Sequence, residues 1–169
     1  MVLDFRYSLK ESQKAIGFKE DVAEFIIFDS QKLLVPEVID AKFSKALWTV
    51  VELLNKRYAN KLDSEFNLYN WIENNPKDEV AYFLNEASSN CMNYAEFKAV
   101  FKIKVYFGEK GFTIGITQQG ESFCAQEIHE MDVKSNEGAG FTFYEECSSK
   151  IFFDDAQKTR TVYFEYLIK

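Results

Sequence analysis

The chain has 169 residues, of which 47% are hydrophobic and 17% aromatic, and its net charge is −7. This length and apolar content suit one well-filled core, so we expect a single domain over residues 1–169 and exclude a disordered chain. The acidic balance, without any long run of Lys or Arg, excludes a surface for nucleic acid.

Neither targeting signals nor cysteine motifs stand out. The first ten residues, MVLDFRYSLK, lack the apolar run of a signal peptide, and the longest uncharged apolar run is FIIF. We therefore expect a cytoplasmic protein with no membrane partner. The cysteines are odd in number and show no CxxC spacing, so Cys91, Cys124 and Cys147 are predicted to be free thiols.

The first half of the chain alternates between strand-like and helical patterns. Apolar residues alternate from Leu3 to Leu9, which predicts a strand, whereas FKEDVAEFIIF (18–28) fits either a helix or a buried strand. Helical spacing over five turns predicts a long amphipathic helix over 37–59. A second, short helix is predicted in SEFNLYNWIE (64–73).

A helix start signal follows. Asn75 can cap a helix, Pro76 suits the first helical position, and Asp78 and Glu79 favour the positive end of the helix dipole. These residues predict a helix over 78–94.

From residue 101 the apolar period changes to two. Residues 101–107 and 112–116 are predicted to form a hairpin across GEKG, and residues 150–153 and 161–167 a second hairpin across DDAQK. A short helical pattern, CAQEIHEM, lies between the hairpins. The predicted fold class is α+β, a two-layer α/β sandwich with helices on one face of a mixed, mostly antiparallel sheet. Whether residues 1–35 form an N-terminal appendage is left open.

The predicted helix over 78–94 carries two stripes at helical spacing. Leu84, Ala87 and Cys91 form an apolar stripe, and Glu86, Asn90 and Asn93 form a polar one. A solvated helix face would explain the polar stripe, and so would a ligand site, and the sequence leaves both open.

The order of motifs after this stripe resembles a known family. Glu86-Ala87-Ser88-Ser89-Asn90 is followed by the loop ITQQGESF, by the glycine loop SNEGAGFTFYEE, and by a terminal hairpin. This order resembles the GHKL superfamily, whose ATPase fold is shared by histidine kinases, gyrase, mismatch-repair ATPases and bacterial anti-sigma-factor serine kinases. The small anti-sigma kinases are the most similar. The resemblance covers 78–169 and, more loosely, the helix over 37–59.

The resemblance implies a role for each matching residue. It implies that Asn90 holds Mg²⁺ beside nucleotide phosphates, and that Glu86 is a catalytic residue that positions or activates a water or hydroxyl. The late threonine near the adenine corresponds to Thr159 or Thr161. The full nucleotide-binding set implied is Asn90, Asn93, Gln118, Gly120, Gly138, Gly140 and Thr159.

The sequence departs from the family in the motif that contacts the adenine base and in the glycine loop SNEGAGFTFYEE, which corresponds to the family's lid over the phosphates. The motif Asp-x-Gly-x-Gly is present as Gln118-Gln119-Gly120-Glu121-Ser122, so an uncharged amide replaces the carboxylate that accepts the adenine amino group. Acidic residues flank Gly138 and Gly140, where triphosphate charge would lie. We therefore expect ATP and Mg²⁺ to bind weakly or not at all.

The histidine and the tryptophans indicate no further site. His129 is the only histidine, which excludes any multi-histidine metal site within one chain, and we expect it to be a surface residue without a role. Trp48 and Trp71 are expected to be packing residues.

These observations favour a bacterial signalling or regulatory protein that acts by binding a protein partner of unknown identity. Two alternatives stay open: an active Mg-ATP-dependent serine/threonine kinase of anti-sigma type, and a structural α+β domain unrelated to nucleotide. A homodimer through the long helix or a sheet edge is also open.

Overall fold

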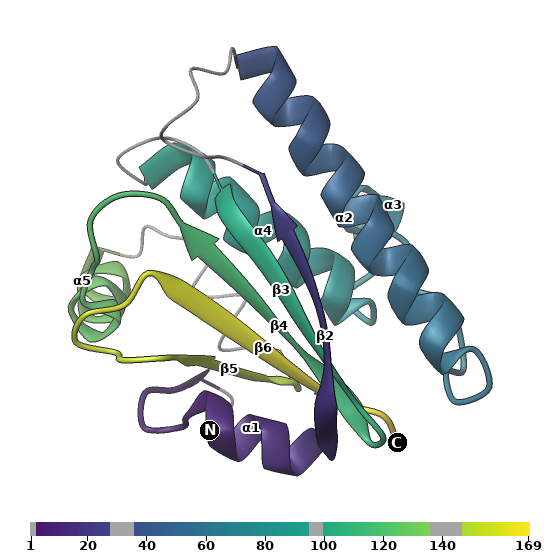
Figure 1. Cartoon of the computed structure of the whole chain (residues 1–169). Helices are drawn as coiled ribbons and strands as arrows, with labels where there is room; N and C mark the ends of the chain where they lie inside the picture. The colour runs from purple at the N-terminus through teal and green to yellow at the C-terminus, as the bar shows by residue number, and fades with distance from the viewer. Residues whose placement is uncertain (1–2, 28–35, 95–99, 136–146) are drawn as a thin grey trace.

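A computed structural model describes the backbone of residues 3–27, 36–94, 100–135 and 147–169. The fold is α+β, and it is built around one six-stranded mixed sheet (Figure 1). The strand order is β1-β5-β6-β4-β3-β2, in which β1 runs parallel to β5 and all other neighbours are antiparallel. The strands are β1 (Leu3–Asp4), β2 (Phe18–Ile26), β3 (Val100–Gly108), β4 (Gly111–Gln118), β5 (Lys150–Phe153) and β6 (Thr161–Leu167). The predicted α+β class and both predicted hairpins are confirmed.

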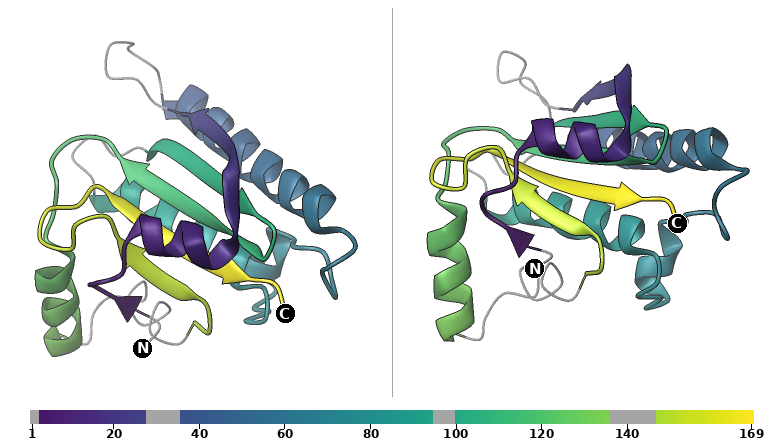
Figure 2. Two further views of the ribbon diagram at one scale, coloured as in Figure 1. Left: turned by 60° about the horizontal axis from the view of Figure 1, so that its bottom comes forward. Right: turned by 90° about the horizontal axis from the view of Figure 1, so that it is seen from below.

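Helices lie on both faces of the sheet (Figure 2). They are α1 (Leu9–Ile16), α2 (Pro36–Tyr58), α3 (Tyr69–Ile72), α4 (Glu79–Tyr94) and α5 (Ala125–Ser135). The expected layer on one face consists of α2 and α4, whose apolar residues join those of the sheet in the main core. The structure differs from the expectation at α1, which packs on the opposite face.

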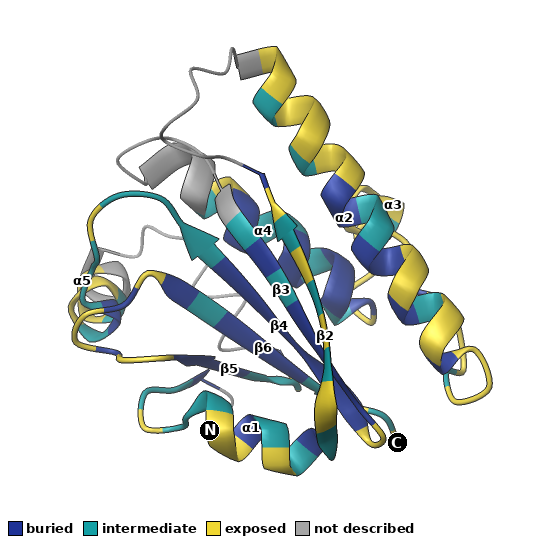
Figure 3. Cartoon of the chain, viewed as in Figure 1, coloured by how far each residue is buried: buried dark blue, intermediate teal, exposed yellow. Residues whose placement is uncertain are grey.

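Strand alternation divides the sheet into these two faces. The residues of β3 and β4 that face α2 and α4 are at most 7% exposed, and Figure 3 shows the central strands largely in the colour of buried residues. They are Ile103, Val105, Phe107, Phe112, Ile114 and Ile116. Burial on this scale is the main stabilising contribution to the fold.

A smaller aromatic cluster covers the opposite face. Ile16 of α1 is fully buried against Tyr106, Phe152 and Tyr163. Ser12 reinforces the contact, because its hydroxyl is 2.7 Å from that of Thr113 on β4. The cluster binds α1 to the sheet independently of the main core.

The predicted strand over residues 3–9 is wrong beyond Asp4. The carboxylate of Asp4 accepts hydrogen bonds from the backbone N–H groups of Arg6 and Tyr7, which turns the chain away from the sheet. Ser8 then caps α1, and its side chain and that of Glu11 each bind the other's backbone N–H. This capping box is a local signal that competes with apolar alternation.

Residues 18–26, which fit a helix or a strand by sequence, form the edge strand β2. Residues 3–27 thus contribute β1 and β2 to the sheet and α1 to the layer that covers one of its faces.

The predicted helices are found, but the one expected over 64–73 is limited to α3 (Tyr69–Ile72), and the start of α4 needs correction. The cap of α4 is Asp78 and not Asn75, because Asp78 Oδ1 accepts a hydrogen bond from Ala81 N at 3.0 Å. The side chain of Asn75 instead accepts from Lys77 N, within the turn before the helix. The other carboxylate oxygen of Asp78 accepts from Asn67 N and Asn70 Nδ2, both at 2.8 Å, and so ties α3 to α4.

Two of the three cysteines are described, and both Cys124 and Cys147 are free thiols, as predicted. The side chain of Cys91 lies outside the described residues. In the described ranges, no helix has both the length and the apolar character that crossing a membrane requires.

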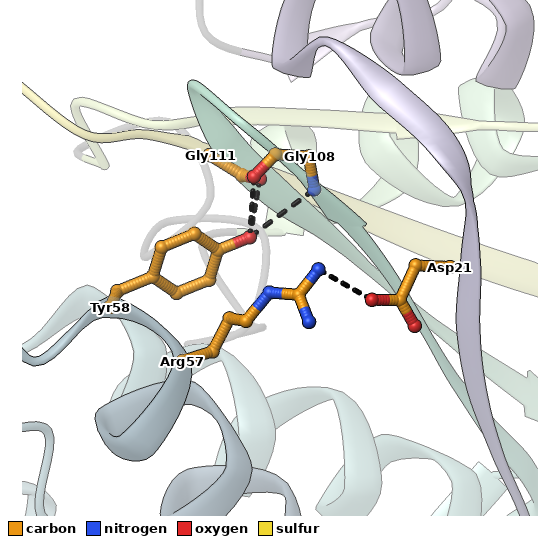
Figure 4. A network of polar contacts seen from close by, with 5 residues as sticks. All are labelled: Asp21, Arg57, Tyr58, Gly108 and Gly111. Atoms are coloured by element: carbon orange, nitrogen blue, oxygen red, sulfur yellow. Dashed lines mark hydrogen bonds and ion pairs between the residues drawn. The ribbon is translucent and has the colours of Figure 1, made fainter.

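The turn between β3 and β4 anchors the long helix (Figure 4). Tyr58, at the end of α2, has its hydroxyl within donating distance of two carbonyls, those of Gly108 at 2.9 Å and Gly111 at 2.8 Å, and it accepts from Gly108 N at 3.2 Å. Beside it, Arg57 forms an ion pair with Asp21 of β2 at 2.5 Å. One end of α2 is therefore bound to both β2 and the hairpin.

We predict that Tyr58→Phe lowers the free energy of unfolding by about 1–3 kcal/mol, because it leaves buried backbone groups of the turn without a partner. Urea unfolding measures the change. Tyr69→Phe is the matched control, since Tyr69 is 58% exposed and should change stability by less than about 0.5 kcal/mol. Equal effects of the two substitutions would contradict the anchoring role.

Candidate functional site

The structure brings three of the predicted site residues to one end of the sheet. The loop after β4 pairs with the β5–β6 connection, because Phe123 and Thr159 exchange backbone hydrogen bonds at 2.9 and 2.8 Å. Gln118 N donates to the carbonyl of Arg160 at 2.9 Å in the same pairing. Gly120 lies in this loop with φ +99°, a conformation that favours glycine.

The polar side chains at this end are bonded within the protein. Gln118 Nε2 donates to the carbonyl of Glu121 at 2.9 Å. Thr159 is fully buried, and its hydroxyl accepts from Thr161 N at 3.1 Å and lies within hydrogen-bond distance of Asp154 and of the Thr161 carbonyl. In this arrangement the hydroxyl of Thr159 faces no open space for a ligand.

The polar stripe of α4 lies on the β5 side of that helix. Glu86 and Asn90 are half-buried, and they share a helix face with Glu79, which precedes them by two and three turns. The Glu79 carboxylate accepts hydrogen bonds from the backbone N–H groups of Ser148 and Ser149, directly before β5. Figure 1 shows that α4 ends at the same end of the sheet as β4.

No hydrogen bond or ion pair within the described ranges joins Glu86 or Asn90 to Gln118 or Gly120. The side chain of Asn93 and both lid glycines, Gly138 and Gly140, lie outside the described residues. The nucleotide set implied by the resemblance therefore stays a prediction.

Glu79 and Glu86 differ in the environment of their carboxylates. Burial raises the pKa of Glu86, and in the part of the chain that the structure describes it has no hydrogen-bond or ion-pair partner. Burial also opposes ionisation of Glu79, but hydrogen bonds from Ser149 and Ser148 outweigh it and hold the pKa of Glu79 below its usual value. Ser149 contributes both its backbone N–H and its hydroxyl, the latter at 2.5 Å.

Among the described side chains, no group of three His, Cys, Asp or Glu residues is placed to hold a metal ion. A Mg²⁺ ion at Asn90 would thus require oxygen ligands from a nucleotide and from water, as Mg²⁺ in phosphate sites commonly has.

The sequence did not predict the groove at the other end of the sheet. Its volume is about 1140 Å³, and residues 61–66, 75–79, 148–150 and 165–169 contribute to its lining. The carboxylates of Asp78 and Glu79 in its wall already accept protein hydrogen bonds. The groove carries charges of both signs and indicates no particular ligand.

Two aromatic predictions have different outcomes. Trp48 packs against Tyr69, with ring centroids 5.2 Å apart. Trp71, expected to be a packing residue, is 44% exposed on α3. His129, expected to have no role, lies with its ring centroid 5.6 Å from that of Phe5.

Comparison with known proteins finds no relative: no protein-family model, no curated protein and no solved structure matches this chain. The likeness to the GHKL superfamily therefore depends on the residues and on the order of elements given above.

We predict that the two carboxylates of α4 shift the pH dependence of stability in opposite directions. The raised pKa of Glu86 means that its ionisation costs stability as pH rises above the usual value of 4.5, so Glu86→Gln should make the protein relatively more stable at pH 7 than at pH 4. The lowered pKa of Glu79 means that its contribution is present above 4.5 and is lost on acidification, so Glu79→Gln should remove stability at pH 7. Urea unfolding at the two pH values tests both signs, and shifts of the same sign would contradict the assignment.

Proposed function

We propose that this protein is a regulatory protein with a GHKL-like ATPase fold whose nucleotide site is degenerate, and that it acts by binding another protein. The order of elements supports the proposal: a helix with Glu86 and Asn90, a strand that ends in the Gln118 loop, and a terminal hairpin. The pairing of the Gln118 loop with the Thr159 segment supports it further, since the resemblance assigns both to the base of the nucleotide.

One observation supports the proposed loss of nucleotide binding: the side chains that the resemblance assigns to the adenine base are hydrogen-bonded within the protein. The side-chain N–H of Gln118 donates a hydrogen bond to the Glu121 carbonyl in its own loop, and Thr159 is fully buried. An adenine that used the Thr159 hydroxyl would have to break its bonds or bind without them, and breaking buried hydrogen bonds without replacing them costs about 1–3 kcal/mol each. The Gln118–Glu121 bond is exposed, and it holds the side-chain amide of Gln118 toward its own loop.

The replacement of Asp by Gln at position 118 acts in the same direction. A charge-assisted hydrogen bond contributes about 1.5–3 kcal/mol and a neutral one about 0.5–1.5 kcal/mol. The difference corresponds to roughly one power of ten in affinity.

One observation favours the kinase alternative. Glu86 is a half-buried carboxylate with a raised pKa, and carboxylates with raised pKa values serve as general bases in many active sites. If the site binds Mg-ATP, Glu86 would accept the proton of the attacking hydroxyl, and the protein would be a serine/threonine kinase.

Calorimetric titration with Mg-ATP and Mg-ADP tests the proposal. We predict no binding by the unmodified protein at micromolar concentrations, and no phosphotransfer. The double variant Gln118→Asp, Ser122→Gly should gain Mg-ATP affinity by about tenfold or more, because it restores the carboxylate and the second glycine.

The control adds Asn90→Ala to the double variant, which should abolish the gain if Asn90 lies at the phosphates. Mg-ATP binding at micromolar affinity by the unmodified protein would contradict the proposal and favour the kinase. A double variant that stays folded and still fails to bind would favour the structural domain unrelated to nucleotide.

A further inference from the structure

Among the described residues, the β2 edge of the sheet is open beyond a bulge near its start. β2 ends the strand order there and pairs only with β3 within these residues. A bulge between Phe18 and Asp21, with Glu20 at φ +61°, interrupts its first half. The remaining segment, 21–26, is regular, and it exposes Val22 by 39% and Ile26 by 61%. Regular edges with exposed apolar residues are sites at which a further strand can pair.

Helix α2 extends beyond this edge. Figures 1 and 2 show α2 lying beside and beyond β2 and not fully beneath the sheet. Two contacts define how the helix is turned. Arg57 forms an ion pair with Asp21 of β2, whereas Trp48 packs against Tyr69 of α3 on the other side. The side of α2 that carries Arg57 therefore faces β2.

A stripe of three lysines, two apolar residues and one threonine lies on the outward part of this side of α2. Leu53 lies one turn before Arg57, and positions three or four residues apart continue the stripe along the helix. Val38 is 39% exposed and Leu53 36%. The members of this lysine stripe are Val38, Lys42, Lys45, Thr49, Leu53 and Lys56.

The lysine stripe is a local positive charge on an acidic protein. Its three lysines are exposed, and none forms an ion pair within the ranges that the structure describes. Of the acidic residues of α2, Glu37 and Asp40 lie outside the stripe, whereas Glu52 borders it, three residues after Thr49 and four before Lys56. The carboxylates of Asp21 and Glu24 on β2 are already paired, with Arg57 and with Lys102 and Lys104. The surface between α2 and the β2 edge thus complements a negative partner.

We propose that this surface binds an extended segment of a partner protein that pairs with β2 as an added strand and carries acidic and apolar residues in alternation. Its backbone would pair with residues 21–26. Its apolar side chains would cover Val22 and Ile26, which lie with Tyr106 on the face away from α2, and its carboxylates, which alternate to the other face, would reach the lysine stripe. The inference rests on the proposed function, since it specifies the kind of protein that the chain binds.

A second copy of the chain fits this surface less well. Pairing of two β2 edges about a two-fold axis would bring the α2 helices of both copies to the same side of the joined sheet. Because each helix extends beyond its own edge, the two helices would compete for one space, and their lysine stripes would face each other. Like charges placed opposite each other disfavour association.

Fluorescence anisotropy with a labelled peptide tests the inference. The probe is a peptide of about eight residues that alternates Glu and Val, and the comparison peptides alternate Lys and Val or contain two central prolines, which cannot pair with an edge. We expect the Glu–Val peptide to bind in low salt, the Lys–Val peptide to bind at least about tenfold more weakly, and the proline peptide not to bind. Hydrogen exchange should show new protection of the β2 amides on binding.

The triple variant Lys42→Glu, Lys45→Glu, Lys56→Glu should weaken binding of the Glu–Val peptide by about tenfold or more. The matched control is Lys10→Glu, Lys77→Glu, Lys158→Glu, which makes the same change in net charge at exposed lysines elsewhere and should weaken binding much less. Equal losses in the two variants, or no binding of the Glu–Val peptide, would overturn the inference. So would a dimer in light scattering that protects the β2 amides without peptide, because a second copy would then occupy the edge.

Failure of this inference differs from failure of the proposed function. Mg-ATP titration of the same samples is independent of the β2 edge. Absent peptide binding together with absent Mg-ATP binding would reject only this surface, whereas tight Mg-ATP binding would reject the proposed function whatever the peptide does.

Discussion

The structure depends on one tight constraint, the β3–β4 turn between Gly108 and Gly111. A Cβ atom at Gly108 would lie 2.1 Å from the carbonyl oxygen of Ile16, and one at Gly111 would lie 2.0 Å from that of Tyr166. These approaches allow α1 and β6 to pack directly against the turn. Lys110 N donates to the Ile16 carbonyl and Ile168 N donates to the Lys110 carbonyl, at 2.8 and 2.9 Å. Tyr58 contacts the same turn from α2, so helices from both faces of the sheet are bonded to this turn.

This arrangement gives the two ends of the sheet different properties. At the turn, backbone contacts from several elements hold the hairpin, and the groove beside it has carboxylates that are already hydrogen-bonded. At the opposite end, loops pair with each other through Phe123 and Thr159. Polar side chains that the GHKL resemblance assigns to a ligand are bonded there within the protein itself.

The β2 edge adds a third kind of surface. Its bulge protects the first residues of the strand, as natural edges are commonly protected. The regular segment 21–26 has no bulge and lies next to a basic, partly apolar side of α2. A protein that acts through contacts with other proteins would use such an edge for specific pairing, because main-chain hydrogen bonds supply affinity and the flanking side chains supply selectivity.

Local patterns in the sequence determined the long helix, both hairpins and the start of α4 to within a few residues. Each of these has a strong period or a turn signal of its own. The mixed sheet and the α+β class followed from the order of those elements. Within the candidate site, sequence alone placed Glu86 and Asn90 on one helix face and Gln118 at a strand end.

Only the tertiary structure decided the rest. The local pattern of residues 3–16 could not reveal that α1 packs on the opposite face and buries Ile16, because this depends on contacts with residues ninety or more positions away. The ambiguous segment 18–26 became a strand because β3 supplied its hydrogen-bond partners. The burial of Thr159 and the bonding of Gln118 were likewise decided by the pairing of two distant loops. Sequence periodicity reports which side of an element is apolar, but the partner that covers it is fixed only when the whole chain packs.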